Sequence, residues 1–151
     1  MFEKRESGQV IVLLALMIVV LLGFAMLAVD AGNAYTEKRQ AQNAADAAAL
    51  AGARQLALEC AKSSGRNEDN IRQAILGMVH LNNPGAVPLA YFTFENGSKS
   101  ACAIGSCLSV ACGCPNRYTG VEVNVSGETP GFLAGLFGHD TLQARASARA
   151  S

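Results

Sequence analysis

The feature that most constrains this chain is an apolar run of twenty residues, positions 10–29, which contains no charged side chain. As an α-helix rising 1.5 Å per residue, this run is about 30 Å long, which matches the hydrocarbon core of a bilayer. A cleaved signal peptide with Lys4 and Arg5 as its basic N-terminal region is the alternative, but the run exceeds the usual apolar region of about 7–15 residues. We therefore expect residues 10–29 to cross a membrane or to form the core of a helical assembly.

The helical pattern continues beyond this run without a proline and with strong helix formers, so one helix is predicted from about Ser7 to about Lys62. The sequence thereby divides into four parts. These are a short tail (residues 1–9), the apolar half of the helix (10–29), its alanine-rich soluble half (30–62), and a small head domain (63–151).

The head domain combines helical and strand patterns. A second helix is predicted from Asn67 to Leu81, since Glu68 and Asp69 suit a first helical turn and apolar residues then follow at helical spacing. Residues 96–100 read as a turn and residues 130–137 as a short helix or turn, whereas three segments alternate as strands do: 88–95, 120–126 and 142–150. The last two are expected to pair. The predicted fold class is α+β, with a small antiparallel sheet packed on the soluble half of the long helix.

Five cysteines, four of them in a loop at residues 100–116, are the second unusual feature of the head domain; they are Cys60, Cys102, Cys107, Cys112 and Cys114. Disulfides would stabilise a loop that buries little apolar surface, which places the head domain in an oxidising compartment outside the cytoplasm. A zinc site competes with this interpretation, but separations of five, five and two residues do not match paired CxxC motifs. Unpaired thiols are a third possibility, and the sequence does not choose a pairing.

Charge and motif content argue against catalysis and nucleic-acid binding. The formal net charge is zero, with 12 basic and 12 acidic residues and no basic cluster, so nucleic acid is not an expected partner. The only histidines, His80 and His139, have no metal ligand at a familiar spacing, and no nucleophile or phosphate-loop motif occurs. We expect no enzymatic activity, no cofactor, no metal and no small-molecule substrate.

The segment from Glu6 to Ala53 resembles the N-terminal segment of the Tad (tight-adherence) pilus-assembly proteins, the TadG-like group. The matching positions are Gly8 before the apolar run, the AVDxG block with Asp30 and Gly32, then Tyr35, Arg39, and the block QNAADAAALAGA from Gln42 to Ala53. The C-terminal stretch from Val121 to Ala150 also resembles family members, with a strand, a TPxFxxxxFG segment and a strand of alternating small residues.

This resemblance implies a pilin-like architecture, because the family is similar to type IV pilins. Type IV pilins are cleaved after a glycine and have a glutamate five residues later, whereas the residue five positions beyond Gly8 is Leu13. We therefore expect an uncleaved N-terminus.

The implied function is that of a structural subunit of a Tad or type IV-like bacterial surface filament. The first alternative is a membrane-resident minor pilin or assembly component, and the second is a secreted, disulfide-stabilised binding module. The expected location is a single pass through the cytoplasmic membrane, with the head domain outside. The expected partners are other copies or other pilus subunits, contacted through the N-terminal helix, together with the membrane and the pilus assembly machinery.

Small residues are the candidate assembly positions, because association of apolar helices depends on the close packing that they permit. An alanine-rich helix covered by its own domain explains the soluble half equally well. Asp30 is expected to mark the water boundary and be solvated, the alternative being a pair with the N-terminal charges of a neighbouring subunit. The candidate assembly residues are Gly23, Asp30, Gly32, Tyr35, Ala41, Ala45, Ala48, Ala49 and Gly52.

Overall fold

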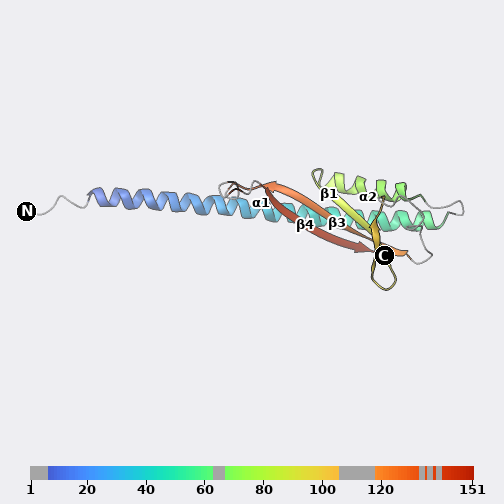
Figure 1. The fold of residues 1–151 in the computed structure, drawn as a ribbon. Helices are drawn as coiled ribbons and strands as arrows, with labels where there is room; N and C mark the ends of the chain where they lie inside the picture. Colours follow the sequence, from blue (N-terminus) through green and yellow to red (C-terminus); the bar gives the residue numbers. More distant parts are fainter. Residues whose placement is uncertain (1–6, 63–66, 106–117, 133–134, 136–137, 139–140) are drawn as a thin grey trace, which may run out of the picture.

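The computed structural model describes residues 7–62, 67–105, 118–132, 135, 138 and 141–151. Its elements are α1 (Ser7–Cys60), α2 (Glu68–Asn82), β1 (Val87–Phe94), β2 (Lys99–Ala103), β3 (Tyr118–Pro130) and β4 (Thr141–Ala150). The predicted α+β class is confirmed, because one long helix carries a four-stranded antiparallel sheet of order β2-β1-β3-β4. Figure 1 shows the sheet and α2 beside the C-terminal half of α1, while the N-terminal half projects alone.

Helix α1 is a single element of 54 residues, so it is about 80 Å long. The prediction of one helix from about Ser7 to about Lys62 is confirmed to within two residues at its end. The helix is long and apolar enough to cross a membrane, and its apolar part lies near the N-terminus.

Helix α2 begins directly after Asn67, within one residue of the predicted start. The side chain of Asn67 caps it by accepting a hydrogen bond of 2.9 Å from the backbone amide of Asp69. Ile71, Ile75 and Val79 recur at helical spacing and are buried. This amphipathic pattern explains why α2 packs against α1 rather than remaining separate.

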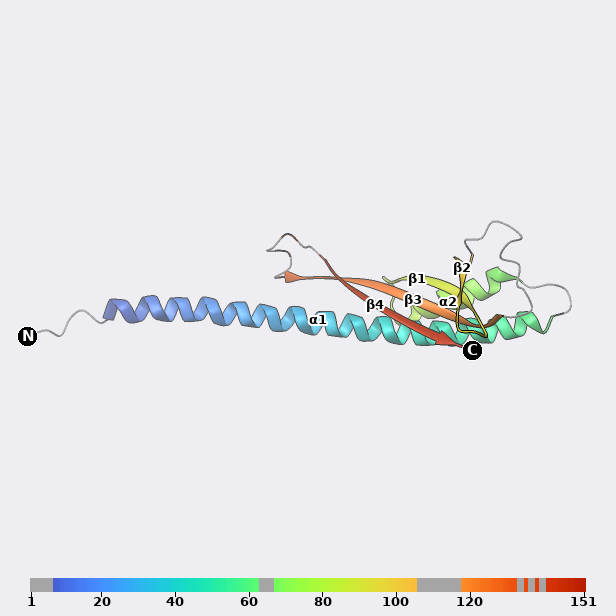
Figure 2. The same ribbon diagram turned by 60° about the horizontal axis from the view of Figure 1, so that its bottom comes forward.

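The predicted pairing of the last two strands is confirmed: Val121 lies opposite Ala150, and Pro130 lies opposite Thr141. Strand β3 is longer than the expected residues 120–126, and its additional pairing with β4 extends the ribbon along α1 towards the apolar half (Figure 2). The expected turn at 96–100 and cysteine loop from residue 100 were wrong for the segment Lys99–Ala103. That segment is strand β2, which pairs with β1 through Tyr91 and Ala103.

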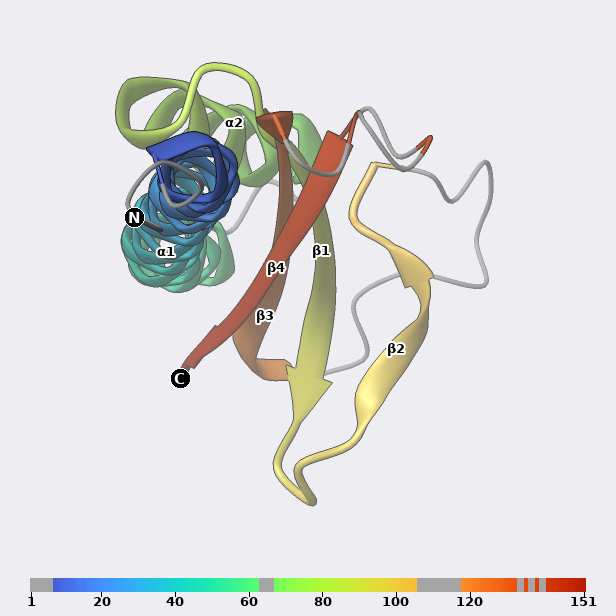
Figure 3. The same cartoon turned by 90° about the vertical axis from the view of Figure 1, so that its left-hand side faces the viewer.

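The core lies between the sheet and the two helices, which together cover one face of the sheet (Figure 3). Five alanines and Leu56 supply the α1 side of this core, and Val121, Val123 and Val125 supply the β3 side. Alanine side chains are short, so the backbone of α1 approaches the sheet closely and a small domain reaches dense packing. The buried α1 alanines are Ala41, Ala44, Ala45, Ala48 and Ala49.

Candidate assembly interface

The apolar half of α1, residues 10–29, is exposed along its whole length. Its large apolar side chains are between 48% and 69% exposed, from Val20 to Val19, and no charged residue interrupts them. So much contiguous apolar surface is far beyond what a soluble monomer leaves in water. Lipid or other apolar helices must therefore cover this surface.

The candidate assembly residues fall into two groups by position. Gly23, Gly32 and Tyr35 remain on the surface of α1; a Cβ atom added at either glycine would meet nothing within 4 Å, and Tyr35 is 71% exposed. The other six are buried: Asp30, and five residues in the chain's own core, which are Ala41, Ala45, Ala48, Ala49 and Gly52. The alanine block is thus covered by its own domain, and only the first group is available on the surface of the folded chain.

Gly52 lies where α1 packs closely against both α2 and β3. A Cβ atom built at this position would lie 2.9 Å from Cγ1 of Ile75 in α2 and 3.3 Å from Cγ1 of Val121 in β3. The absence of a side chain therefore lets α1 contact α2 and the sheet at the same level.

Asp30 is buried, so the expectation of a solvated carboxylate at the water boundary was wrong. It is only 6% exposed, and its Oδ1 atom accepts a hydrogen bond of 2.9 Å from the backbone amide of Phe132. Phe132 follows the end of β3 by two residues. The β3–β4 ribbon thus covers the first charged residue after the apolar run, and the helix surface turns polar only beyond it.

A second polar junction joins α1, α2 and β3 two turns further along α1. The Asn83 side chain, which follows α2 and is buried, donates a hydrogen bond of 2.7 Å to Oε1 of Glu37. A Cβ atom at Gly127 of β3 would clash with that same carboxylate oxygen. Glycine is therefore needed in β3 for the Glu37–Asn83 pair to lie against the sheet.

The Glu59 side chain connects the end of α1 to the start of α2, although nothing in the sequence singled it out. Its Oε1 atom accepts hydrogen bonds from Lys62 (2.6 Å), Asn70 (2.8 Å) and Gln55 (3.1 Å), and its Oε2 atom accepts one from the Asn67 amide (3.1 Å). The side chain has no solvent exposure. Together these bonds lower the pKa of Glu59 from 4.5 to about 2, because each favours the charged carboxylate. The bond from Lys62 has the largest effect.

The outer face of the sheet carries a second set of charges. Glu122 on β3 pairs with Arg149 on β4 at 2.7 Å and with Lys99 on β2 at 3.4 Å. The hydrogen bond from Arg149 is the main reason that the pKa of Glu122 is lowered, and it outweighs partial burial, which acts to raise it. Arg149 also donates to the carbonyl oxygen of Gly97, so it ties the β1–β2 turn to β4.

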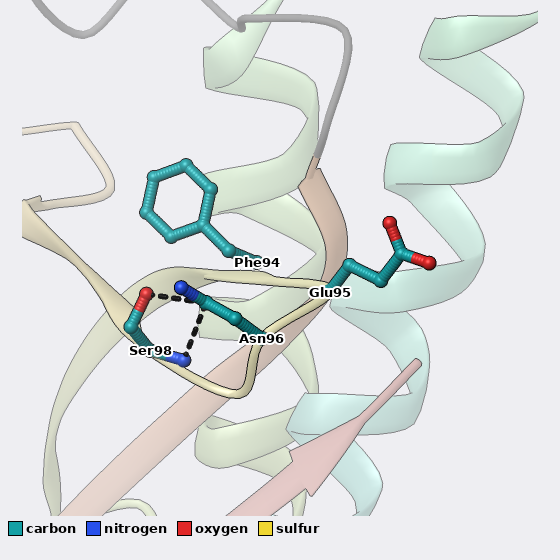
Figure 4. A pocket seen from close by; sticks show the side chains of 4 residues that line it. All are labelled: Phe94, Glu95, Asn96 and Ser98. Carbon is teal, nitrogen blue, oxygen red and sulfur yellow. Dashed lines mark hydrogen bonds between the residues drawn. The ribbon is translucent and has the colours of Figure 1, made fainter.

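The turn between β1 and β2 forms a pocket lined by Phe94, Glu95, Asn96 and Ser98 (Figure 4). The Asn96 Oδ1 atom accepts hydrogen bonds from both the amide and the hydroxyl of Ser98, at 3.0 and 2.7 Å. These polar groups therefore satisfy one another within the turn, and Glu95 is the one charged group among the described residues that line the pocket.

The predicted disulfides lie mostly outside the described residues, and they stay a prediction. Cys60 is exposed and free, Cys102 belongs to β2, and Cys107, Cys112 and Cys114 are not among the residues described. His80 is exposed in the last turn of α2, and His139 also lies outside the description. Among the described residues, no group of three His, Cys, Asp or Glu side chains is placed to hold a metal ion.

An exposed apolar helical half, continuous with a polar half that carries a small sheet domain, fits a membrane-anchored, single-pass protein. Comparison with known families supports a more specific statement. Residues 8–55 match the model of the Tad family, described as "Putative Flp pilus-assembly TadE/G-like". This match confirms the resemblance seen in the sequence, covers most of α1 and supports a pilus-related role. Neither the curated proteins nor the solved structures gave a match to the chain.

Proposed function

We propose that this protein is a structural, pilin-like subunit of a Tad or type IV-like surface filament, in which residues 10–29 pack against the same segment of neighbouring subunits. The observation that carries the proposal is the exposure of this charge-free helical half outside a domain that is packed without it. The Tad match over residues 8–55 supports the pilus context, because it includes this apolar half.

Surface glycines support helix packing in this half. Gly23 lies within the apolar run and Gly32 just beyond it, and a Cβ atom at either position would meet nothing within the chain. Small residues let the backbones of apolar helices approach closely, and close packing is what drives their association in an apolar environment.

The proposed role is structural rather than enzymatic. The buried acidic side chains are committed to the fold: Asp30 bonds the Phe132 amide, and Glu59 joins α1 to α2. We further propose that the sheet domain lies outside the cytoplasm, with its cysteines oxidised, and that the pilus assembly machinery is a partner.

A membrane-resident minor pilin or assembly component is the second candidate. Leu13 occupies the position at which type IV pilins have a glutamate, so the apolar half carries no charge to neutralise a neighbouring N-terminus. A charge-free segment is stable in lipid without a partner, which favours a subunit that stays in the membrane.

The experiment that separates the two roles is recovery of the protein from sheared extracellular fibres and from washed membranes, with intact mass and N-terminal sequencing of each. Full-length chain concentrated in fibres supports the filament subunit, whereas recovery from membranes alone supports the assembly component. A chain that begins near residue 29 would contradict both, because the apolar half would have been removed.

A matched pair of variants tests whether residues 10–29 are responsible. Val20→Asp places a charge at an exposed position in the apolar half, and Leu50→Asp places one at an exposed position in the soluble half. A charge in an apolar helix core costs at least about 2.5 kcal/mol, so Val20→Asp should be depleted from fibres and reduced in membranes while Leu50→Asp behaves as the wild type.

A further inference from the structure

We propose that Phe132, two residues past the end of β3 and called the tip of the β3–β4 ribbon below, is a second membrane-contact site, in which its ring enters the boundary between lipid headgroups and acyl chains beside α1. The inference rests on membrane anchoring through residues 10–29 and adds a contact from a separate part of the chain. The surface is the exposed side chain of Phe132, and its partner is the bilayer that holds the helix.

The first observation is the position of Phe132 along the axis of α1. Its backbone amide is bonded to Asp30, one residue past the end of the apolar run, so the tip of the ribbon lies where the helix leaves the hydrocarbon. The two segments therefore meet the bilayer surface together, although they are far apart in the sequence.

The second observation is that Phe132 is 70% exposed at that level. The sequence from Pro130 to Gly138 contains no charged residue, and Asp140 follows immediately before β4. An exposed aromatic ring loses contact with water when it enters the interfacial region, where apolar side chains of surface-bound segments are buried by about 5–10 Å.

The third observation is the order of charges along α1. Asp30 is covered and its Oδ1 atom accepts the Phe132 amide bond, and Glu37, the next acidic residue, is half-buried and bonded to Asn83. The next basic residues, Lys38 and Arg39, are exposed and begin about 12 Å further along the helix, close to where lipid phosphates would lie. Along α1 the surface is therefore first apolar, then covered at Asp30, and then basic. This order matches the passage from the hydrocarbon core of a bilayer to its headgroups.

The test uses tryptophan fluorescence, because the chain contains no tryptophan and a single substitution becomes the only reporter. Three full-length variants are reconstituted into phosphatidylcholine vesicles whose acyl chains are brominated either near the headgroup or near the chain end. The variants are Phe132→Trp at the tip, Val20→Trp within the apolar half, and Leu58→Trp on the same helix about 42 Å beyond Asp30. All three positions are exposed, so the substitutions leave the core intact.

We expect Phe132→Trp to emit at shorter wavelength in vesicles and to be quenched mainly by bromine near the headgroup. Val20→Trp should be quenched most by bromine near the chain end, and Leu58→Trp by neither. If Val20→Trp is quenched while Phe132→Trp behaves as Leu58→Trp, the tip contact is wrong and the anchor stands. If Val20→Trp is also unquenched, anchoring itself fails and the inference falls with it.

A neighbouring subunit is the other surface that the tip could meet. In that case the Phe132→Trp emission would shift with the ratio of protein to lipid and would not be quenched by bromine. This result would overturn lipid contact and assign Phe132 to a contact between copies.

Discussion

The Oδ1 atom of Asp30 accepts a 2.9 Å hydrogen bond from the backbone amide of Phe132, a residue 102 positions later in the chain. This bond fixes how far the β3–β4 ribbon reaches along α1. It also removes from solvent the one charged side chain at the junction of the apolar and soluble halves.

Replacing Asp30 by alanine should destabilise the sheet domain by about 1–3 kcal/mol, because a partly buried amide loses its acceptor. Thermal unfolding of the full-length protein in detergent micelles measures the effect. Asp30→Asn retains Oδ1 and should recover part of the stability. Asp46→Ala on the exposed face of α1, where Gln42 is the partner, should change stability by less than about 0.5 kcal/mol. Equal stability of the Asp30→Ala and Asp46→Ala proteins would show that the Phe132 bond contributes nothing.

Two glycines of α1 should respond to alanine in opposite directions. At Gly52 the new Cβ atom would lie 2.9 Å from Ile75, and overpacking of this kind costs about 1–3 kcal/mol. At Gly32 nothing lies within 4 Å, so alanine should stabilise the helix by about 1 kcal/mol.

Unfolding midpoints of the Gly52→Ala and Gly32→Ala proteins in the same micelles make the comparison. Shortening the clashing side chain, as in a Gly52→Ala, Ile75→Val double variant, should restore part of the loss. Stabilisation by both single substitutions would contradict the close approach of α1 and α2.

The stability of the domain should fall in acid as Glu59 becomes protonated. Its folded pKa of about 2 is below the ordinary value of 4.5, so the charged carboxylate stabilises the fold above the ordinary value, and this contribution is lost as pH falls from 4.5 towards 2. Thermal unfolding followed across this range should show a declining midpoint in the wild type.

The Glu59→Gln protein has no titrating group at this position, so its thermal unfolding midpoint should decline less between pH 4.5 and 2. Glu122 has a lowered pKa as well and leaves a residual dependence in both proteins. Parallel curves for wild type and Glu59→Gln would mean that the bonds from Lys62, Asn70 and Asn67 do not stabilise the charged form.

Arg149→Ala should lower stability modestly, by about 0.2–1 kcal/mol for its exposed pair with Glu122 and somewhat more for the lost bond to Gly97. The ion-pair part should shrink at high salt, because screening weakens exposed charges. Arg145→Ala, two alternations earlier on the same face of β4, removes a hydrogen bond to Gln143 and is the control. An effect of Arg149→Ala that does not depend on salt would assign the whole loss to the Gly97 bond.

The sequence predicted the elements whose signals are local. The uninterrupted helix formers of α1, the Asn67 cap of α2 and the alternating valines of β3 each act over a few residues, and the structure confirms them. The match of residues 8–55 to the Tad family likewise rests on one continuous segment.

The elements that the sequence missed depend on distant contacts. Strand β2 has the sequence KSACA, which has weak strand propensity, and it becomes a strand because β1 lies beside it. The end of β3 contains glycine and proline, and the predicted strand stopped at residue 126, but pairing with β4 and contact with Glu37 keep the chain extended to Pro130. Asp30 resembled a solvated helix residue and Glu59 was not singled out, because the partners that bury them follow later in the chain.

The distance in sequence between Asp30 and Phe132 has a consequence for folding order. Contacts between residues so far apart form late, since a long loop must close before they contribute any stability. Helix α1 is held by local bonds and can form early, with its alanine face uncovered until β3 and β4 arrive. During synthesis the new chain therefore passes through a stage in which this bare helix is open to capture by chaperones or by other helices, and the closing of the ribbon onto Asp30 ends that stage.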